Sequence, residues 1–398
     1  MASPACSVRR RIETEEAQRP PPALSDDLQE EIFLRIGSPT DLVRASTACV
    51  AFRRLITDTS FLRRYRAIHP PLLFGFISHA GLLRAEPPHP SSPAAAAANF
   101  FFNNYLPPGR GSWWYPCDVR DGRVLLYCTL KHNDCDLFPD LAVCDPLSRR
   151  YMLLPPIPEG LITSVQARKQ NIDASESLLV LSGQEELETS FRVICCMRCA
   201  TRLVVFIYST VSGCWSVTTS PTWPSLGLNV LPPDLLELEM GAKCAYGCFY
   251  WQVENMNKLL KLDMNIMEFS INDLPPDHDR RIVCVVEGGE GKLAMFSQNE
   301  DGTSVEYYIL LQDDNGRATE WHMKNTIPLP FNYYSYITCS SEGYIFLVGT
   351  LKEQDMKHTT HFSLEIKTFN IQRVCQFRSC SAYPYFGFPP SISPSRIQ

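Results

Sequence analysis

Cysteines and histidines are the side chains of this sequence that could bind a metal ion, and three groups of them have suggestive spacing. The groups are Cys128, His132, Cys135 and Cys144; Cys195, Cys196 and Cys199; and His358 with His361. The first group spans two expected strands and a loop, without the paired C-x-x-C knuckles of structural zinc sites. The second lies in a strand-like run that points its members to opposite faces, and the third lies in a polar loop. We therefore expect structural cysteines and solvated histidines, with no metal and no cofactor.

A second possible site is the glycine-rich string Gly288-Gly289-Glu290-Gly291-Lys292. It superficially resembles a phosphate-binding loop, but the leading glycine is missing at the required offset. Leu293 also replaces the Ser or Thr that would bind magnesium. A hairpin turn explains these glycines better, and the sequence has no G-x-S-x-G elbow or H-E-x-x-H helix. We predict that the chain is not an enzyme.

Two clusters of aromatic residues could instead bind a target protein. They are Trp113, Trp114 and Tyr115, and Tyr333, Tyr334 and Tyr336, and they stand beside Gly and Pro in expected loops. Trp and Tyr often anchor protein interfaces, and loops often carry the binding residues of a rigid scaffold. The alternative is that these rings pack in the interior.

The composition of the 398-residue chain limits the classes of protein it could be. Its length suits a small domain followed by a large one. The formal net charge of −6, with both signs interspersed, gives no reason to expect a nucleic-acid partner. No apolar run approaches the roughly 18 residues of a membrane span, and residues 1–23 have no secretory pattern. We expect a protein of the cytoplasm, the nucleus or both, with its 16 cysteines reduced.

Residues 1–22 predict a disordered tail, and residues 24–68 have helical spacing. Ser25 suits the N-cap of a first helix in which Leu28, Ile32 and Ile36 form one apolar stripe. A second helix is expected over residues 41–50 and a third around residues 52–56, before a last helical turn. These helices carry more apolar positions than so small a domain can bury alone, which suggests a partner protein.

The segment from Leu24 to Arg66 resembles an F-box, the module that docks on a Skp-family adaptor. The matching features include Asp26-Asp27-Leu28, Glu31-Ile32, Arg35-Ile36, Asp41-Leu42, Phe52-Arg53, Leu55-Ile56 and Phe61-Leu62. Ser25 and Phe52 stand where the family often has Pro and Trp. The resemblance implies that the adaptor-binding residues are Leu24, Leu28, Ile32, Phe33, Ile36, Leu42, Cys49, Phe52 and Leu55. It also implies a cullin scaffold, reached through the adaptor.

After Pro70-Pro71 the pattern changes to short apolar runs bounded by Gly, Pro, Asp and Asn, which indicates many strands. A glycine followed by a hydrophobic strand recurs at Gly122, Gly247, Gly291 and Gly343. A strand, a polar turn and a bulky residue six positions later recur as well, for example from Asp145 to Tyr151. The turns are some 50 to 64 residues apart, which is the range of a kelch-type propeller blade. About six blades fit, one of them degenerate and closed by a C-terminal strand; a β-sandwich is the alternative.

The whole chain resembles the grass F-box proteins in which a segment similar to His69–Phe76 joins the F-box to a propeller-like associated domain. We expect a disordered tail (1–22), a three-helix F-box (23–68), a β-propeller (69–385) and a flexible C-terminal tail (386–398). The implied function is that of a substrate receptor in a Skp–cullin–F-box ubiquitin ligase. Two alternatives remain: a propeller-based small-molecule sensor or enzyme that carries an F-box, and a cullin-independent scaffold.

Overall fold

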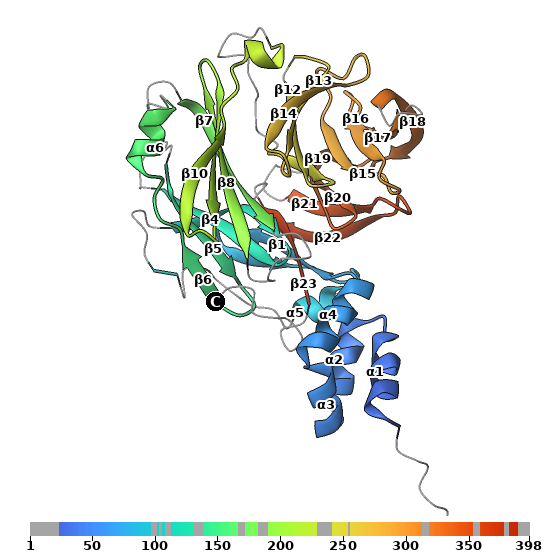
Figure 1. The fold of residues 1–398 in the computed structure, drawn as a ribbon. Coiled ribbons are helices and arrows are strands. Elements are labelled where there is room, and N and C mark those ends of the chain that lie inside the picture. Colours follow the sequence, from blue (N-terminus) through green and yellow to red (C-terminus); the bar gives the residue numbers. More distant parts are fainter. Residues whose placement is uncertain are drawn as a thin grey trace, which may run out of the picture.

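The computed structural model describes residues 24–96, 102, 106–107, 113–129, 138–165, 172–181, 190–228, 241–253, 255–312, 318–352, 359–377 and 382–388. Within these ranges, four helices precede a large domain built from six antiparallel sheets (Figure 1). The tail expected over residues 1–22 lies outside the described residues.

The four N-terminal helices, with His69, form a unit that we call the helical module (residues 24–69). They are α1 (Asp26–Leu34), α2 (Pro39–Ser46), α3 (Val50–Ile56) and α4 (Thr59–Ile68). Each helix is capped by a side chain, because Ser25, Ser38, Cys49 and Asp58 accept hydrogen bonds from backbone N–H groups of the first turn. The expected last turn is in fact the ten-residue helix α4, so the module has four helices rather than three.

Five of the six sheets have four strands in chain order. Blade 1 contains β3 (Trp113–Arg120), β4 (Arg123–Thr129), β5 (Asp140–Asp145) and β6 (Arg150–Leu153). Blade 2 contains β7 (Ile172–Leu181), β8 (Phe191–Cys199), β9 (Leu203–Ser209) and β10 (Cys214–Thr219). Blade 3 contains β11 (Lys243–Ala245), β12 (Cys248–Val253), β13 (Lys258–Asp263) and β14 (Glu268–Asp273). Blade 4 contains β15 (Val283–Glu287), β16 (Leu293–Gln298), β17 (Ser304–Gln312) and β18 (Ala318–Pro328). Blade 5 contains β19 (Tyr333–Ser341), β20 (Tyr344–Leu351), β21 (Thr359–Glu365) and β22 (Ile371–Phe377).

The sixth sheet, which we call the closing blade, joins the two ends of the large domain. It contains β1 (Leu72–Ser78), β2 (Gly81–Arg84) and the C-terminal strand β23 (Tyr383–Gly387), in the order β2-β1-β23. Two short helices, α5 (Ser92–Ala96) and α6 (Glu159–Ser164), and the 3-10 helix η3 (Pro224–Leu226) lie in connections. Because β23 is paired in register, the tail expected from residue 386 onward begins too early: Phe386 pairs with Leu73 and Gly387 with Leu72.

Apolar side chains fill each contact between neighbouring blades. Separate clusters join blades 1 and 2, blades 2 and 3, blades 3 and 4, and blades 4 and 5. A further cluster joins the closing blade to blades 1 and 5. The ring is therefore a closed six-bladed β-propeller, which confirms the blade number expected from the repeat and excludes the β-sandwich.

The repeated sequence features have simple structural roles. In blades 1, 3, 4 and 5 the turn between the first and second strands contains Gly122, Gly247, Gly291 and Gly343, with φ between 69° and 80°. Residues other than glycine rarely adopt this left-handed conformation. The six-residue spacing spans the turn between the third and fourth strands, where the Asp145 side chain accepts a hydrogen bond from the backbone N–H of Leu147.

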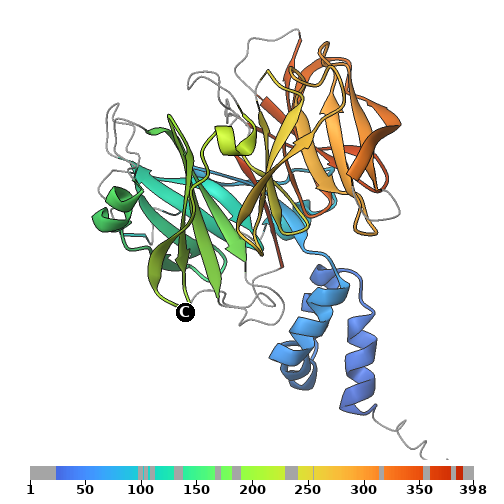
Figure 2. The same ribbon diagram turned by 45° about the horizontal axis from the view of Figure 1, so that its top comes forward.

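Strand direction places the helical module on one side of the propeller. The innermost strands (β3, β7, β11, β15, β19 and β23) begin at one face, which we call the distal face, and end at the other, the helix-side face. Leu72, the first residue of β1, pairs with Gly387 at the end of β23, so the module joins the propeller at the helix-side face. In Figures 1 and 2 the helices project from the propeller as a separate body, and α1 lies at their right-hand edge in Figure 1.

Candidate functional site

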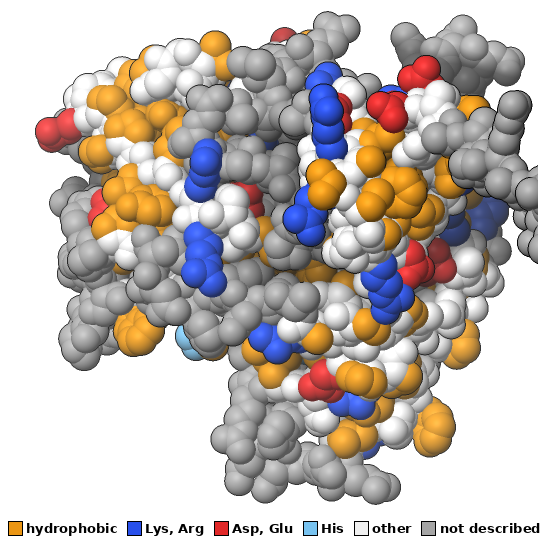
Figure 3. Space-filling view, turned by 90° about the horizontal axis from the view of Figure 1, so that it is seen from below, with side chains coloured by type: hydrophobic (Ala, Val, Ile, Leu, Met, Phe, Trp, Pro, Cys, Tyr) orange, Lys and Arg blue, Asp and Glu red, His pale blue; other side chains and the backbone are white. Residues whose placement is uncertain are grey.

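One side of α1 exposes apolar side chains to solvent. Leu24, Leu28 and Ile32 are 52%, 54% and 49% exposed, although each is a large hydrophobic residue. Leu28 and Ile32 are four residues apart on α1, so they lie on the same side of the helix, and Leu24 directly precedes its N-cap Ser25. We call these three residues the α1 stripe. Figure 3 shows the helix side of the molecule, where apolar side chains lie on the surface among charged ones.

Hydrogen bonds and ion pairs hold α1 against α4. The guanidinium of Arg64 on α4 donates to the carboxylates of Glu30 and Glu31, with Nη2 2.7 Å from Glu31 Oε1. Tyr65 donates its hydroxyl hydrogen to the Ile36 carbonyl oxygen at 2.8 Å, and His69 Nε2 donates to the Leu34 carbonyl oxygen at 2.7 Å. These bonds join α1 to α4 and fix which side of α1 faces solvent.

The structure separates the nine predicted adaptor-binding residues into three groups. Leu24, Leu28, Ile32 and Cys49 are exposed, Ile36, Phe52 and Leu55 are partly buried, and Phe33 and Leu42 are buried. Phe33 is 6% exposed and packs edge-on against Phe52 at 5.0 Å, and Leu42 is fully buried. Phe33 and Leu42 therefore belong to the core of the module in this chain, and their direct contact with a partner stays a prediction.

The two predicted aromatic clusters begin innermost strands and do not lie in loops. Trp113, Trp114 and Tyr115 start β3, and Tyr333, Tyr334 and Tyr336 lie at the start of β19. Both clusters therefore lie at the distal face, on the two blades that flank the closing blade. The loop assignment failed because each cluster directly follows turn residues in the sequence, while its own side chains alternate along a strand.

Strand alternation leaves one well-exposed ring in each cluster. Trp113 is 52% exposed and Tyr334 is 64% exposed, with the Lys352 ammonium 5.2 Å from the Tyr334 ring centroid. Trp114 is 3% exposed and donates from Nε1 to the Pro107 carbonyl oxygen. The remaining rings are partly buried: Tyr115 stacks on Tyr127, and Tyr333 lies edge-on to Phe362. Trp113 and Tyr334 are thus the aromatic side chains of these clusters that are open to a partner.

Charged residues meet in the central channel, where sequence analysis predicted nothing. Arg120 Nε lies 2.8 Å from Asp118 Oδ2 on β3, and Asp118 is 8% exposed. Glu176 on β7 accepts hydrogen bonds from Trp251 Nε1 at 2.7 Å and from the Ala242 backbone N–H at 2.8 Å. Burial raises the pKa of the Glu176 carboxyl, and those two hydrogen bonds oppose the rise. The Glu176 hydrogen bonds connect blade 2 to blade 3 beside the axis, and the Asp118–Arg120 pair lies within β3 of blade 1.

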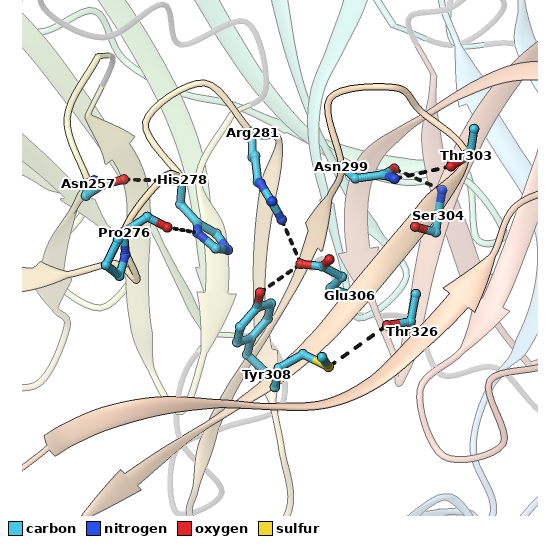
Figure 4. Close-up of polar contacts among 11 residues, drawn as sticks. Asn257, Pro276, His278, Arg281, Asn299, Thr303, Ser304, Glu306, Tyr308 and Thr326 are labelled. Atoms are coloured by element: carbon cyan, nitrogen blue, oxygen red, sulfur yellow. Dashed lines mark hydrogen bonds and ion pairs between the residues drawn. The ribbon is translucent and has the colours of Figure 1, made fainter.

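A second polar cluster lies at the distal face between blades 3 and 4 (Figure 4). Glu306 Oε2 accepts from Arg281 Nη1 at 2.6 Å and from the Tyr308 hydroxyl at 2.7 Å. His278, 3% exposed, donates from Nδ1 to the Pro276 carbonyl oxygen and stands edge-on to the Tyr308 ring. Burial lowers the pKa of His278, so the ring is neutral near pH 7. The cluster fixes the connection between β14 and β15 onto blade 4.

The candidate metal and phosphate sites take structural roles. Cys128 and Cys144 are buried on adjacent strands, and His132, Cys135 and His358 lie outside the described residues. His361 is 1% exposed on β21 with its ring stacked on Phe377, so its expected place in a polar loop is wrong. Across the residues that the structure describes, no three His, Cys, Asp or Glu side chains are grouped to hold a metal ion.

The other two candidates agree with the sequence analysis. Cys195 and Cys196 face different inter-blade clusters, as strand alternation requires. Burial raises the pKa of the Cys195 thiol to about 11, so it is protonated and a poor nucleophile near pH 7. Gly288 to Lys292 form the turn between β15 and β16, closed by a hydrogen bond from the Gly288 N–H to the Lys292 carbonyl oxygen.

Comparisons with known proteins show similarity in fold only. No family model and no curated protein matches the chain. Among solved structures, a six-bladed fungal lectin from Aleuria aurantia is 14% identical, with a TM-score of 0.36, over 65% of this chain and 76% of the lectin. An exo-β-1,3-galactanase from Clostridium thermocellum is 12% identical, with a TM-score of 0.36, over 67% of this chain and 64% of the galactanase. A β-fructofuranosidase from Bombyx mori is 14% identical, with a TM-score of 0.33, over 70% of this chain and 66% of that enzyme.

The chain thus spans slightly less than two thirds of the galactanase and of the fructofuranosidase. At these identities and TM-scores the likeness carries no argument about a ligand or a reaction. Within the described ranges, no helix has the length and apolar character needed to cross a membrane.

Proposed function

We propose that this chain is the substrate receptor of a Skp–cullin–F-box ubiquitin ligase, in which the helical module is the F-box and the propeller binds the target. The observation that carries the proposal is the α1 stripe. Leu24, Leu28 and Ile32 are about half exposed on a module whose sequence resembles an F-box. Burial of these apolar side chains against a partner is favourable, by about 25 cal/mol for each Å² of apolar surface removed from water.

The mechanism is positional and involves no covalent chemistry by this chain. The α1 stripe docks on a Skp-family adaptor, which attaches to a cullin scaffold. The distal face, with Trp113 and Tyr334, binds the target protein. Because the two surfaces lie on opposite sides of the propeller, the target and the adaptor do not compete for space. The ligase gains rate by holding lysines of the target at high effective concentration near the charged conjugating enzyme.

A binding titration against a purified Skp-family adaptor tests this function. Ile32→Asp places a charge at the C-terminal end of the α1 stripe, so docking would bury that charge without a partner. We expect its affinity to fall more than about 100-fold, which corresponds to about 3 kcal/mol. The matched control is Val211→Asp, since Val211 is 79% exposed in the turn between β9 and β10 and lies outside the module. Equal affinities for wild type and Ile32→Asp would refute the assigned surface.

Ubiquitin transfer in a reconstituted assay separates this function from a cullin-independent scaffold. A complete ligase should transfer ubiquitin when adaptor, cullin and conjugating enzyme are added, and a scaffold should bind the adaptor without transfer. The sensor or enzyme alternative needs polar groups that converge in the channel. Asp118, Arg120 and Glu176 do converge there, so the channel is where this alternative would place its ligand.

A further inference from the structure

The last described residue of the chain leaves the propeller and enters the helical module. Phe388 directly follows β23 and is 4% exposed. It belongs to the same apolar cluster as Phe33, Leu42 and Tyr65, which are residues of α1, α2 and α4. A side chain more than 300 residues away in sequence therefore completes the core of the N-terminal module.

Two residues of α4 lie against the Phe388 ring. The Tyr65 ring lies edge-on to the Phe388 ring with centroids 6.5 Å apart, and the Arg66 guanidinium carbon lies 5.9 Å from its centroid. Tyr65 is itself fixed by its hydrogen bond to Ile36 and by the His69 ring, 4.3 Å away. Phe388 thus contacts a part of the module that is rigidly connected to α1.

The module is attached to the propeller at two neighbouring points. The first is the direct connection from α4 to β1 through Pro70 and Pro71, whose rings restrict the backbone. The second is Phe388. Since Leu72 pairs with Gly387, the two attachments leave the closing blade side by side. One covalent link alone would let the module swivel, whereas a second contact removes that freedom.

The path of the chain into Phe388 is closely packed. A Cβ added at Gly387 would lie 3.0 Å from the Phe74 ring and 3.4 Å from Leu147 Cδ1. Phe74 of β1 is fully buried beneath this point, and its ring stacks on Tyr385, which lies on β23 like Gly387. Packing on both sides of Gly387 therefore fixes the direction in which the chain leaves β23.

We propose that Phe388 is a positioning residue that locks the helical module at one angle to the propeller. The functional half of this inference rests on the function proposed above: the lock sets the distance between the adaptor on the α1 stripe and a target at the distal face. A ligase with fixed geometry presents a narrow set of lysines to the conjugating enzyme, and a loosened one presents a wider set.

Two variants of the full chain test the lock. Phe388→Ala removes the aromatic ring that packs into the core of the helical module. Insertion of three glycines between Gly387 and Phe388 keeps the ring and lengthens the connection by about 10 Å. It therefore tests the positioning role even if Phe388→Ala destabilises the module itself. Phe331→Ala is the matched control, because Phe331 is 89% exposed between blades 4 and 5.

The first readout is small-angle X-ray scattering of each purified chain. We expect both lock variants to show a longer maximum dimension and a broader distance distribution than wild type and Phe331→Ala. Scattering curves that superimpose for the glycine insertion and wild type would overturn the inference. This readout needs no adaptor, so it remains decisive even if the wild-type chain does not bind one.

The second readout maps ubiquitin on the chain itself in the reconstituted ligase. Lys292, Lys352 and Lys367 are exposed acceptors on the propeller. We expect the glycine insertion to bind the adaptor within about twofold of wild type and to spread ubiquitin over more of these lysines. An unchanged lysine pattern, in a variant that binds the adaptor normally, would refute the positioning role. Failure of the wild type to bind the adaptor would refute the proposed function instead.

Discussion

Lys243 on β11 donates a hydrogen bond from Nζ to the carbonyl oxygen of Thr338 on β19, at 2.8 Å. The bond joins blade 3 to blade 5 and passes blade 4, so it crosses the inside of the ring. Lys243 is 6% exposed, and its charge also lies near Glu176, whose pKa it helps to lower against the effect of burial. The propeller is therefore held together inside the channel by a charged side chain as well as by apolar contacts between blades.

Replacing Lys243 by methionine should destabilise the propeller. Methionine has a similar length, but it cannot donate to Thr338, and hydrogen bonds from charged groups contribute about 1.5–3 kcal/mol. We expect the free energy of unfolding in urea to fall by about 2 kcal/mol. Lys352→Met is the control, since Lys352 is exposed on the distal face, and it should have little effect. Equal unfolding midpoints for wild type and Lys243→Met would show that the cross-channel bond contributes nothing.

Glu176 predicts a pH dependence with a definite sign. Its pKa is raised in the folded chain by burial, so the folded state keeps a proton that the unfolded state has already released. This contribution to stability is present at low pH and is lost as the pH rises through the raised pKa. The stability of wild type relative to Glu176→Gln should therefore decrease with rising pH, measured by urea unfolding at several pH values.

Glu306→Gln is the matched control for that measurement and should give the opposite slope. Burial tends to raise the pKa of Glu306, but the hydrogen bonds from Tyr308 and Arg281 outweigh it and the net shift is downward. The stability that wild type holds over Glu306→Gln should therefore be present at neutral pH and be lost as the pH falls. Slopes of the same sign for both variants would contradict these assignments.

Gly75 in β1 should tolerate no side chain. Its φ is +137°, and an added Cβ would overlap the Leu83 carbonyl oxygen and lie 2.9 Å from the Ala85 nitrogen. Gly75→Ala should therefore force β1 and β2 apart and cost about 4 kcal/mol or more of stability. Gly213→Ala has a φ of +67° but nothing within 4 Å of the new Cβ, so it should cost only about 1 kcal/mol. Thermal unfolding compares the two, and similar losses would argue against the close approach.

Local patterns predicted the first three helices and the repeated turns of the blades, although α4 was expected only as a last turn. Ser25 caps α1 and Asp58 caps α4 because a side-chain oxygen before an apolar stripe satisfies free N–H groups wherever the helix lies. The glycine before the second strand of blades 1, 3, 4 and 5 marks a turn whose backbone only glycine adopts easily. These signals depend only on residues that are close in sequence, so they can be read from the sequence of a single chain.

Contacts between distant segments could not be predicted in the same way. The channel bond from Lys243 to Thr338 and the contact of Phe388 with Tyr65 each depend on how the ring closes. Trp113 and Trp114 show the same limit within a single strand: alternation places them on opposite faces, but the sequence does not say which face is solvent. The six-bladed ring decides that Trp113 is open and Trp114 is buried.

Ile32 and Phe33 are neighbours on α1, but Ile32 is exposed and Phe33 is buried, so alanine variants of the two separate an effect on the surface from an effect on the core. Phe33→Ala removes a ring that is 6% exposed and packs on Phe52, so it should destabilise the module by about 3 kcal/mol. Ile32→Ala removes a side chain that is 49% exposed, so it should change stability by less than about 0.5 kcal/mol. Amide hydrogen exchange in α1 and α4 of the full chain measures both effects locally.

Adaptor binding should distinguish these two variants by whether a loss of affinity is accompanied by faster amide exchange in α1. Ile32→Ala should lower the affinity while exchange in α1 stays slow, because the lost methyl groups belong to the docking surface. Phe33→Ala should lower the affinity only as far as α1 exchange becomes faster, because its ring acts through the fold of the module. If Phe33→Ala instead weakened binding with normal exchange protection, the buried ring would have to turn outward to meet the adaptor. The assignment of Phe33 to the core of the module would then be wrong.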